Sequence, residues 1–95
     1  MITSKQRAQL RGMANPLPAI LQIGKGGICE NLLRQIDDAL EARELVKISI
    51  LETALLDARA TCSHIAKELH AEPVQAIGSK FVLYRESKEN KKIVI

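Results

Sequence analysis

Apolar residues recur along this 95-residue chain with two spacings, which predict alternating helices and strands. A spacing of three and four residues predicts three helices, over residues 4–14, 28–43 and 57–70. Short apolar or alternating runs predict four strands, over residues 19–23, 44–51, 73–77 and 80–85. The order α-β-α-β-α-β-β predicts an α/β fold: a single compact domain over residues 1–95, with a four-stranded mixed sheet and three helices.

Local residue choices fix several element ends. Thr3 followed by Gln6 is a capping box for the first helix, and Asp57 is placed to cap the third. The strand–helix–strand spacing across residues 19–51 predicts a parallel pair with a right-handed crossover. Gly78-Ser79 between two apolar runs predicts a hairpin with a type II′ turn. Residues 86–95 are expected to form a charged, loosely ordered tail whose final apolar residues could add to a sheet edge.

Charge is distributed unevenly, although the net charge is only +3. Residues 1–29 contain four basic residues and no acidic one, whereas residues 30–72 carry five basic and nine acidic residues. Residues 73–95 carry five basic and two acidic residues. The two basic ends could form one positive face if the fold brings them together, which would favour an anionic partner.

The stretch Gly24-Lys25-Gly26-Gly27 follows a predicted strand and precedes a predicted helix. Such a turn exposes backbone N–H groups near the positive end of a helix, an arrangement that favours phosphate. The P-loop pattern is absent, and the dinucleotide pattern fails because Cys29 stands where its third glycine belongs. Two interpretations remain: an ordinary strand–helix turn, or a GxxG loop, which in KH-type modules clamps a nucleic-acid backbone.

Other candidate sites give weaker patterns. Cys29 and Cys62 fall at apolar positions of predicted helices, which predicts two buried free thiols and fits a reducing cytoplasm. His64 and His70 lack the spacing of two metal ligands on one helical face. No catalytic constellation, signal peptide or membrane span is evident. With Phe81 and Tyr84 as the only aromatic residues, phosphate contacts should dominate over base stacking.

Several separate motifs, in order, resemble the CRM domain (chloroplast RNA splicing and ribosome maturation) in its single-domain bacterial, YhbY-like form. They are Thr3-x-Lys5-Gln6, Leu10-Arg11, Pro16-Leu17, Ile23-Gly24-Lys25-Gly26-Gly27, Ala39-Leu40-Glu41, Glu44-Leu45-Val46-Lys47-Ile48, Val74-Gln75-Ala76-Ile77-Gly78 and Val82-Leu83-Tyr84-Arg85. The resemblance implies a fold similar to the C-terminal domain of translation initiation factor 3. It also implies RNA binding and association with precursors of the large ribosomal subunit.

The resemblance places the RNA surface at the GxxG loop and nearby basic residues. By position these are Gly24, Lys25, Gly26 and Gly27, with Lys5, Arg11 and Lys47. The basic ends add Arg7, Lys80 and Arg85 as further candidates. We expect a cytoplasmic, monomeric RNA-binding protein that is not an enzyme and uses no cofactor, metal, membrane or small-molecule substrate.

Two alternatives from different classes remain open, of which one is a nucleotide-using enzyme. The acidic residues of the second helix could instead form the working face of a protein–protein adaptor in a ribosomal or translation complex. These residues are Asp37, Asp38, Glu41 and Glu44.

Overall fold

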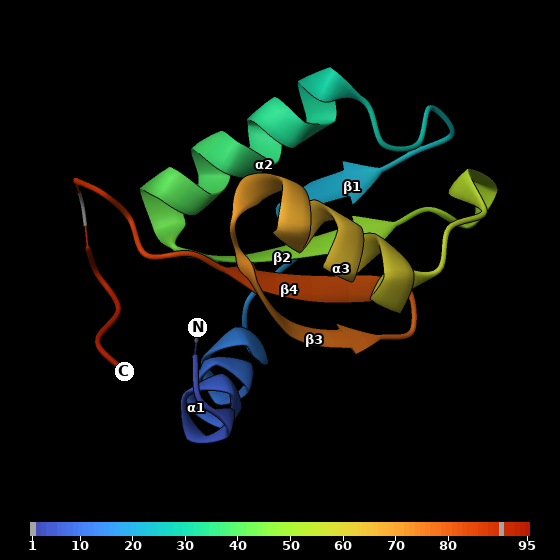
Figure 1. Cartoon of the computed structure of the whole chain (residues 1–95). Coiled ribbons are helices and arrows are strands. Elements are labelled where there is room, and N and C mark those ends of the chain that lie inside the picture. Colours follow the sequence, from blue (N-terminus) through green and yellow to red (C-terminus); the bar gives the residue numbers. More distant parts are fainter. Residues whose placement is uncertain (1, 90) are drawn as a thin grey trace.

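A computed structural model describes residues 2–89 and 91–95 and shows the expected alternation of elements (Figure 1). In chain order the elements are α1 (Ser4–Ala14), β1 (Leu21–Ile23), α2 (Glu30–Arg43), β2 (Leu45–Ile50), the short 3₁₀ turn η1 (Glu52–Ala54), α3 (Ala58–Leu69), β3 (Glu72–Ile77) and β4 (Lys80–Tyr84). The predicted order of helices and strands is therefore confirmed. The 3₁₀ turn was not predicted.

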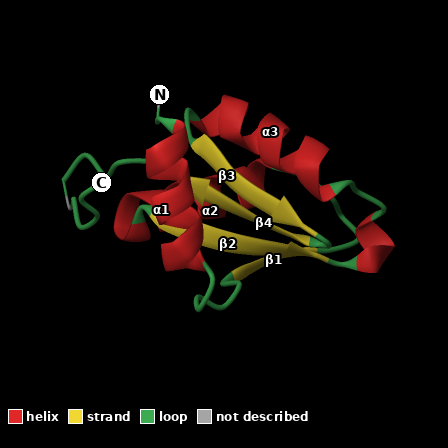
Figure 2. Ribbon diagram, turned by 90° about the horizontal axis from the view of Figure 1, so that it is seen from below, coloured by secondary structure: helices red, strands yellow, loops and turns green. Residues whose placement is uncertain are grey.

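The four strands form one mixed sheet in the order β1-β2-β4-β3. β1 and β2 are parallel, as the strand–helix–strand spacing predicts, and the other two pairs are antiparallel. Helices α2 and α3 cover one face of the sheet, and α1 lies across the other (Figures 1 and 2). The protein is thus a single α/β domain of three layers.

Two apolar clusters hold these layers together, because strand side chains alternate between the faces. The larger cluster joins α2 and α3 to the sheet and is centred on Ile36, Ile48, Ile65 and Phe81. The smaller cluster joins α1 to the opposite face through Leu10 and Ala14. On β4 the alternation is plain, since Phe81 belongs to the first cluster and Val82 to the second.

Most predicted helix ends are confirmed. The hydroxyl of Thr3 accepts a hydrogen bond from the N–H of Gln6, whose side chain in turn accepts from the N–H of Thr3. The carboxylate of Asp57 accepts from the N–H of Ala60 and caps α3. In the hairpin, Gly78 has φ +59° while Ser79 does not have positive φ, which matches the expected type II′ turn.

The prediction of two buried thiols is right for Cys62 and wrong for Cys29. The irregular loop after β1 continues through Cys29, so α2 begins at Glu30 rather than at residue 28. Cys29 therefore has extended backbone (φ −136°) and its side chain is exposed. Burial raises the pKa of the Cys62 thiol to about 11.

The expectation of a loosely ordered tail is also wrong for the residues that the structure describes. Ser87, Lys92 and Ile93 donate backbone hydrogen bonds to the carboxylate of Glu44 at the end of α2. Ile93 and Ile95 pack against the α1 cluster, and residues 91–95 add no strand to the sheet. The tail therefore belongs to the packed structure.

Within residues 2–89 and 91–95, none of the helices has the length and apolar character needed to cross a membrane.

Candidate nucleic-acid interface

The glycine stretch forms a tight turn between β1 and α2. The N–H of Gly27 donates to the carbonyl of Gly24 at 2.9 Å, so Lys25 and Gly26 occupy the two central positions. Gly27 has φ +68°, a backbone conformation that residues other than glycine adopt only with strain. Lys25 is exposed at the tip. The sequence thus builds a projecting cation on a short, bare backbone.

The turn is fixed to the sheet by its neighbours. A Cβ built on Gly24 would lie 3.6 Å from Cδ1 of Leu51, which is ordinary van der Waals contact. The N–H of Leu51 donates to the carbonyl of Ile23 at 2.8 Å, and the N–H of Ile50 donates to the carbonyl of Ser79 at 2.7 Å. These bonds place the GxxG turn and the β3–β4 turn at one end of the sheet, where Figure 1 shows the former beside η1.

The start of α2 adds partial positive charge near the turn. Within the described structure, the side chain of Cys29 makes no hydrogen bond that caps the helix. The first N–H groups of α2 therefore lack a side-chain partner at the N-cap, where the helix dipole favours an anion. Glu30 supplies a carboxylate in the same first turn, which weakens this effect.

Lys47 and Lys80 lie together on the α1 face of the sheet. Both line a cavity of about 180 Å³, together with Asn15, Gln75, Ile77 and Val82. The ammonium of Lys47 donates to the carbonyl of Asn15 at 3.4 Å, and Lys80 follows the β3–β4 turn directly. Two cations far apart in the sequence therefore share one hollow. Asn15 and Gln75 are polar partners there that charge counting could not identify.

The three cations of α1 do not face the same way. Nε of Arg7 donates to the carbonyl of Pro73 at 3.1 Å, which ties Arg7 to strand β3. Arg11 is exposed one helical turn further along the same flank. Lys5 is exposed and lies roughly 140° around the helix from the buried Leu10. Arg7 and Arg11 thus border the sheet face, whereas Lys5 points to solvent.

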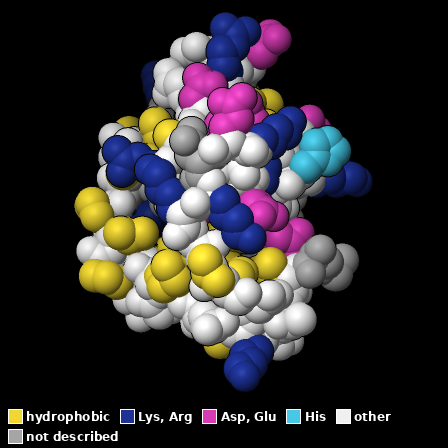
Figure 3. Space-filling view, turned by 90° about the vertical axis from the view of Figure 1, so that its left-hand side faces the viewer, with side chains coloured by type: hydrophobic (Ala, Val, Ile, Leu, Met, Phe, Trp, Pro, Cys, Tyr) yellow, Lys and Arg dark blue, Asp and Glu magenta, His cyan; other side chains and the backbone are white. Residues whose placement is uncertain are grey.

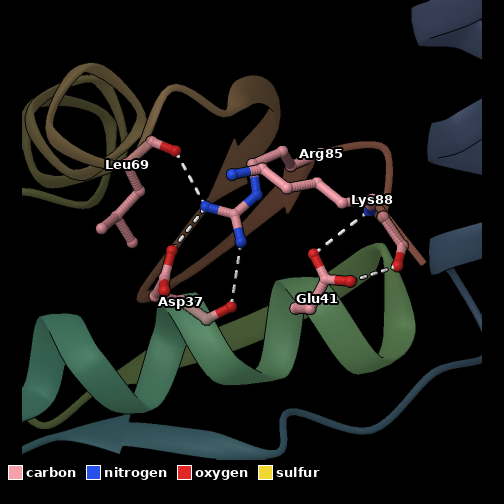
Figure 4. A network of polar contacts seen from close by, with 6 residues as sticks. Asp37, Glu41, Leu69, Arg85 and Lys88 are labelled. Carbon is pink, nitrogen blue, oxygen red and sulfur yellow. Dashed lines mark hydrogen bonds and ion pairs between the residues drawn. The ribbon is translucent and has the colours of Figure 1, made fainter. Parts of the chain in front are cut away.

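Arg85 is engaged within the protein. Its guanidinium pairs with the carboxylate of Asp37 at 2.6 Å and donates to the carbonyls of Asp37 and Leu69 (Figure 4). These contacts tie β4 to α2 and α3. We therefore leave Arg85 out of the candidate interface, although the charge pattern included it.

The acidic side chains of α2 are also largely engaged. Glu41 accepts hydrogen bonds from the hydroxyl of Ser87 and from the N–H groups of Lys88 and Glu89. The Ser87 hydroxyl and the Lys88 N–H hold the pKa of Glu41 below its ordinary value. Asp37 pairs with Arg85.

Glu44 is fully buried. Burial raises its pKa, but the N–H groups of Ser87, Lys92 and Ile93 lower it by more, and the net shift is downward. Three of the four carboxylates proposed for an adaptor face therefore bind groups within this protein.

Within the part of the chain that the structure describes, no three His, Cys, Asp or Glu side chains are grouped so as to hold a metal ion.

The geometry can be compared with known proteins. The model of the CRS1/YhbY (CRM) domain matches residues 2–85, nearly the whole chain. The chain belongs to this family. It is 46% identical over 93 residues to the Bacillus subtilis protein named "Probable RNA-binding protein YqeI", covering 98% of this chain and 97% of that protein. It is 33% identical to a Haemophilus influenzae protein named "RNA-binding protein", covering 95% and 91%.

A solved structure supports the fold of this CRM-family protein directly. The solution structure of SAV1595 from Staphylococcus aureus superposes with a TM-score of 0.84 and 47% sequence identity, covering 100% of this chain and 99% of that one. The Bacillus subtilis and Haemophilus influenzae relatives are named as RNA-binding proteins and not as enzymes. The family assignment from sequence motifs is thus confirmed.

Proposed function

We propose that this protein binds RNA through its sugar–phosphate backbone and acts in the maturation of the large ribosomal subunit. One observation carries the first part of the proposal: the exposed Lys25 and the bare glycine backbone project beside the α2 N-terminus. An RNA backbone can approach such a turn closely because no side chain stands on Gly24, Gly26 or Gly27.

Further cations support a phosphate-binding surface. Lys47 and Lys80 share a hollow on the α1 face, and Arg7 and Arg11 project from the adjoining flank of α1. Phosphate contacts of this kind position an RNA without reading its sequence. Lys5 lies further out and adds to the long-range positive field.

The ribosomal part of the proposal rests on the family resemblance together with the relatives named as RNA-binding proteins. In this account the protein works as a cytoplasmic monomer, with ribosomal RNA or a pre-ribosomal particle as its partner. It uses no cofactor.

Most of the acidic side chains that the adaptor alternative requires are engaged within the protein. Asp37, Glu41 and Glu44 are bound to Arg85 and to the C-terminal segment, which leaves the exposed Asp38 as the member of that set outside these bonds. A protein docking on this face would have to displace these bonds.

Crosslinking in living cells, followed by sequencing of the attached RNA, tests the proposal. We expect crosslinked fragments enriched in the large-subunit rRNA and its precursors over the small-subunit rRNA. Enrichment of messenger or transfer RNA instead would contradict the ribosomal assignment while leaving RNA binding intact.

A further inference from the structure

A second hollow, separate from the GxxG turn, lies between the end of α1, strand β2 and the C-terminal segment. It has a volume of about 320 Å³. Its apolar wall is formed by Met13, Leu17, Pro18, Ile20, Leu45, Val46 and Ile93. Figure 3 looks onto this end of the molecule and shows hydrophobic side chains in a band, with both basic and acidic side chains above it.

Three cations and no acid complete the described lining of this hollow. Arg43 ends α2, Lys47 comes from β2, and Lys92 comes from the C-terminal segment. An apolar interior with a cationic edge suits a ligand that has an apolar body and an anionic group. A nucleotide has both, in its base and its phosphate.

We propose that this hollow binds one unpaired nucleotide of the RNA, with the base against the aliphatic wall and the phosphate near the three cations. This inference rests on the proposed function and adds a base-binding subsite to it. Unpaired bases bind apolar side chains and can stack on an Arg guanidinium, which Arg43 supplies. The volume is at the lower end of the range of roughly 300–1,000 Å³ found for small-ligand pockets.

Lys47 connects this subsite to the proposed phosphate surface. The same side chain lines both the apolar hollow and the hollow that contains Lys80. From Ile20, at the edge of the subsite, to Gly24 the chain advances four residues, or about 13 Å in extended conformation. A single-stranded RNA bound at the GxxG turn could therefore extend to the hollow.

The size argues against a protein helix as the occupant. A helix docked in a groove buries a row of anchors at i, i+4 and i+7, which needs an elongated channel. A hollow of about 320 Å³ takes one anchor group. The shared Lys47 also places it beside the proposed RNA surface rather than on a separate face.

The test compares RNA strands that have equal charge and differ in their bases. The probes are oligoadenylate, oligocytidylate and oligouridylate of about twelve nucleotides, and an abasic ribose–phosphate strand of equal length. Fluorescence anisotropy gives their affinities. We expect at least one homopolymer to bind about fivefold or more tightly than the abasic strand. The variants Leu17→Ala and Met13→Ala should each reduce that ratio toward one without changing the affinity for the abasic strand.

Both side chains are partly exposed, at 38% for Leu17 and 43% for Met13, so their truncation should leave the fold intact. Val94→Ala is the matched control, because Val94 follows the lining residue Ile93 in the sequence but is exposed and is not part of the lining. Circular dichroism and thermal unfolding verify folding of each variant.

The outcomes separate this inference from the function on which it rests. Lys25→Glu should weaken binding of homopolymer and abasic strand alike, with their ratio unchanged. If the wild type binds all strands equally, RNA binding stands and the base subsite is refuted. If the homopolymer-to-abasic affinity ratio is unchanged in both Leu17→Ala and Met13→Ala, the base subsite is also refuted, and the hollow would bind another partner, such as a protein. Failure of every strand to bind would overturn both proposals.

Discussion

The carboxylate of Glu44 accepts a hydrogen bond at 2.7 Å from the backbone N–H of Ile93, which lies 49 residues further along the chain. The same carboxylate accepts from Ser87 at 2.8 Å and from Lys92. Glu44 itself is fully buried. Its backbone has φ +67°, a value that is rare for residues other than glycine. One carboxylate at the end of α2 thus fixes the C-terminal segment to the domain.

Replacing Glu44 with alanine should lower the stability of the fold. Three backbone N–H groups would lose their charged acceptor, and a lost hydrogen bond to a charged group costs about 1.5–3 kcal/mol in unfolding free energy. Urea denaturation measures the loss. Glu68→Ala is the control, because Glu68 is exposed on α3 and its removal should change stability by no more than about 0.5 kcal/mol. Equal stability of the two variants would contradict the structural role of Glu44.

Acid should weaken the same attachment. The pKa values of Glu41 and Glu44 are both lowered from 4.5 in the folded protein. A lowered pKa contributes stability that is complete above the unfolded-state value and is lost as pH falls through the folded-state value. The urea midpoint should therefore decrease as the pH falls below 4.5. The double variant Glu41→Gln, Glu44→Gln should show a shallower decrease, and an unchanged slope would assign the effect to other carboxylates.

Arg85 and Lys80 should respond oppositely to truncation. Arg85→Ala removes the pair with Asp37 and two bonds to carbonyls, so it should lower stability by about 1–2 kcal/mol with little effect on RNA affinity. Lys80 is exposed, so Lys80→Ala should leave stability nearly unchanged and weaken RNA binding about threefold or more. Thermal unfolding and anisotropy measure both quantities. The reverse pattern would return Arg85 to the interface.

Two glycines of the turn separate function from folding. A Cβ at Gly26 would meet no atom of the described structure within 4 Å, so Gly26→Ala should fold normally. Its methyl group would nevertheless stand between the turn and an approaching RNA backbone, and affinity should fall about fivefold or more. Gly27→Ala should lower stability by about 1 kcal/mol because of its φ of +68°. Unchanged RNA affinity in Gly26→Ala would show that the backbone of the turn is not approached closely.

Sequence patterns predicted the fold well because its determinants are local. The apolar spacing, the Thr3–Gln6 capping box, the Asp57 cap and the Gly78-Ser79 turn each act within a few residues. The family resemblance rested on motifs of the same local kind.

The features that sequence patterns did not indicate arise mostly from contacts between distant residues. Charge counting treats Arg85 as an available cation, yet its partner Asp37 lies 48 residues away. The same limit applies to Glu44 and the tail, since no short-range pattern shows that a carboxylate on α2 will bind N–H groups beyond Tyr84. Cys29 is a different case, because its place in an apolar stripe concealed the extended backbone of the turn before α2.

The candidate interface could be predicted only in part. The glycine turn is contiguous in the sequence, so Gly24 to Gly27 could be identified directly. Lys47 and Lys80 line the same hollow because of the register of β2 and β4, in which Ser49 lies opposite Lys80. The hollow between Met13, Arg43 and Lys92 brings together three segments, and no sequence spacing indicates it.

The most direct test of an RNA site at the turn compares two charge reversals in binding to a large-subunit rRNA transcript. Lys25→Glu reverses the charge at the tip of the GxxG turn. Lys67→Glu makes the same charge change at an exposed position of α3. With both variants folded by circular dichroism, we expect affinity to fall about tenfold or more for Lys25→Glu and less than about threefold for Lys67→Glu. Equal effects of the two reversals would contradict an RNA site at the turn.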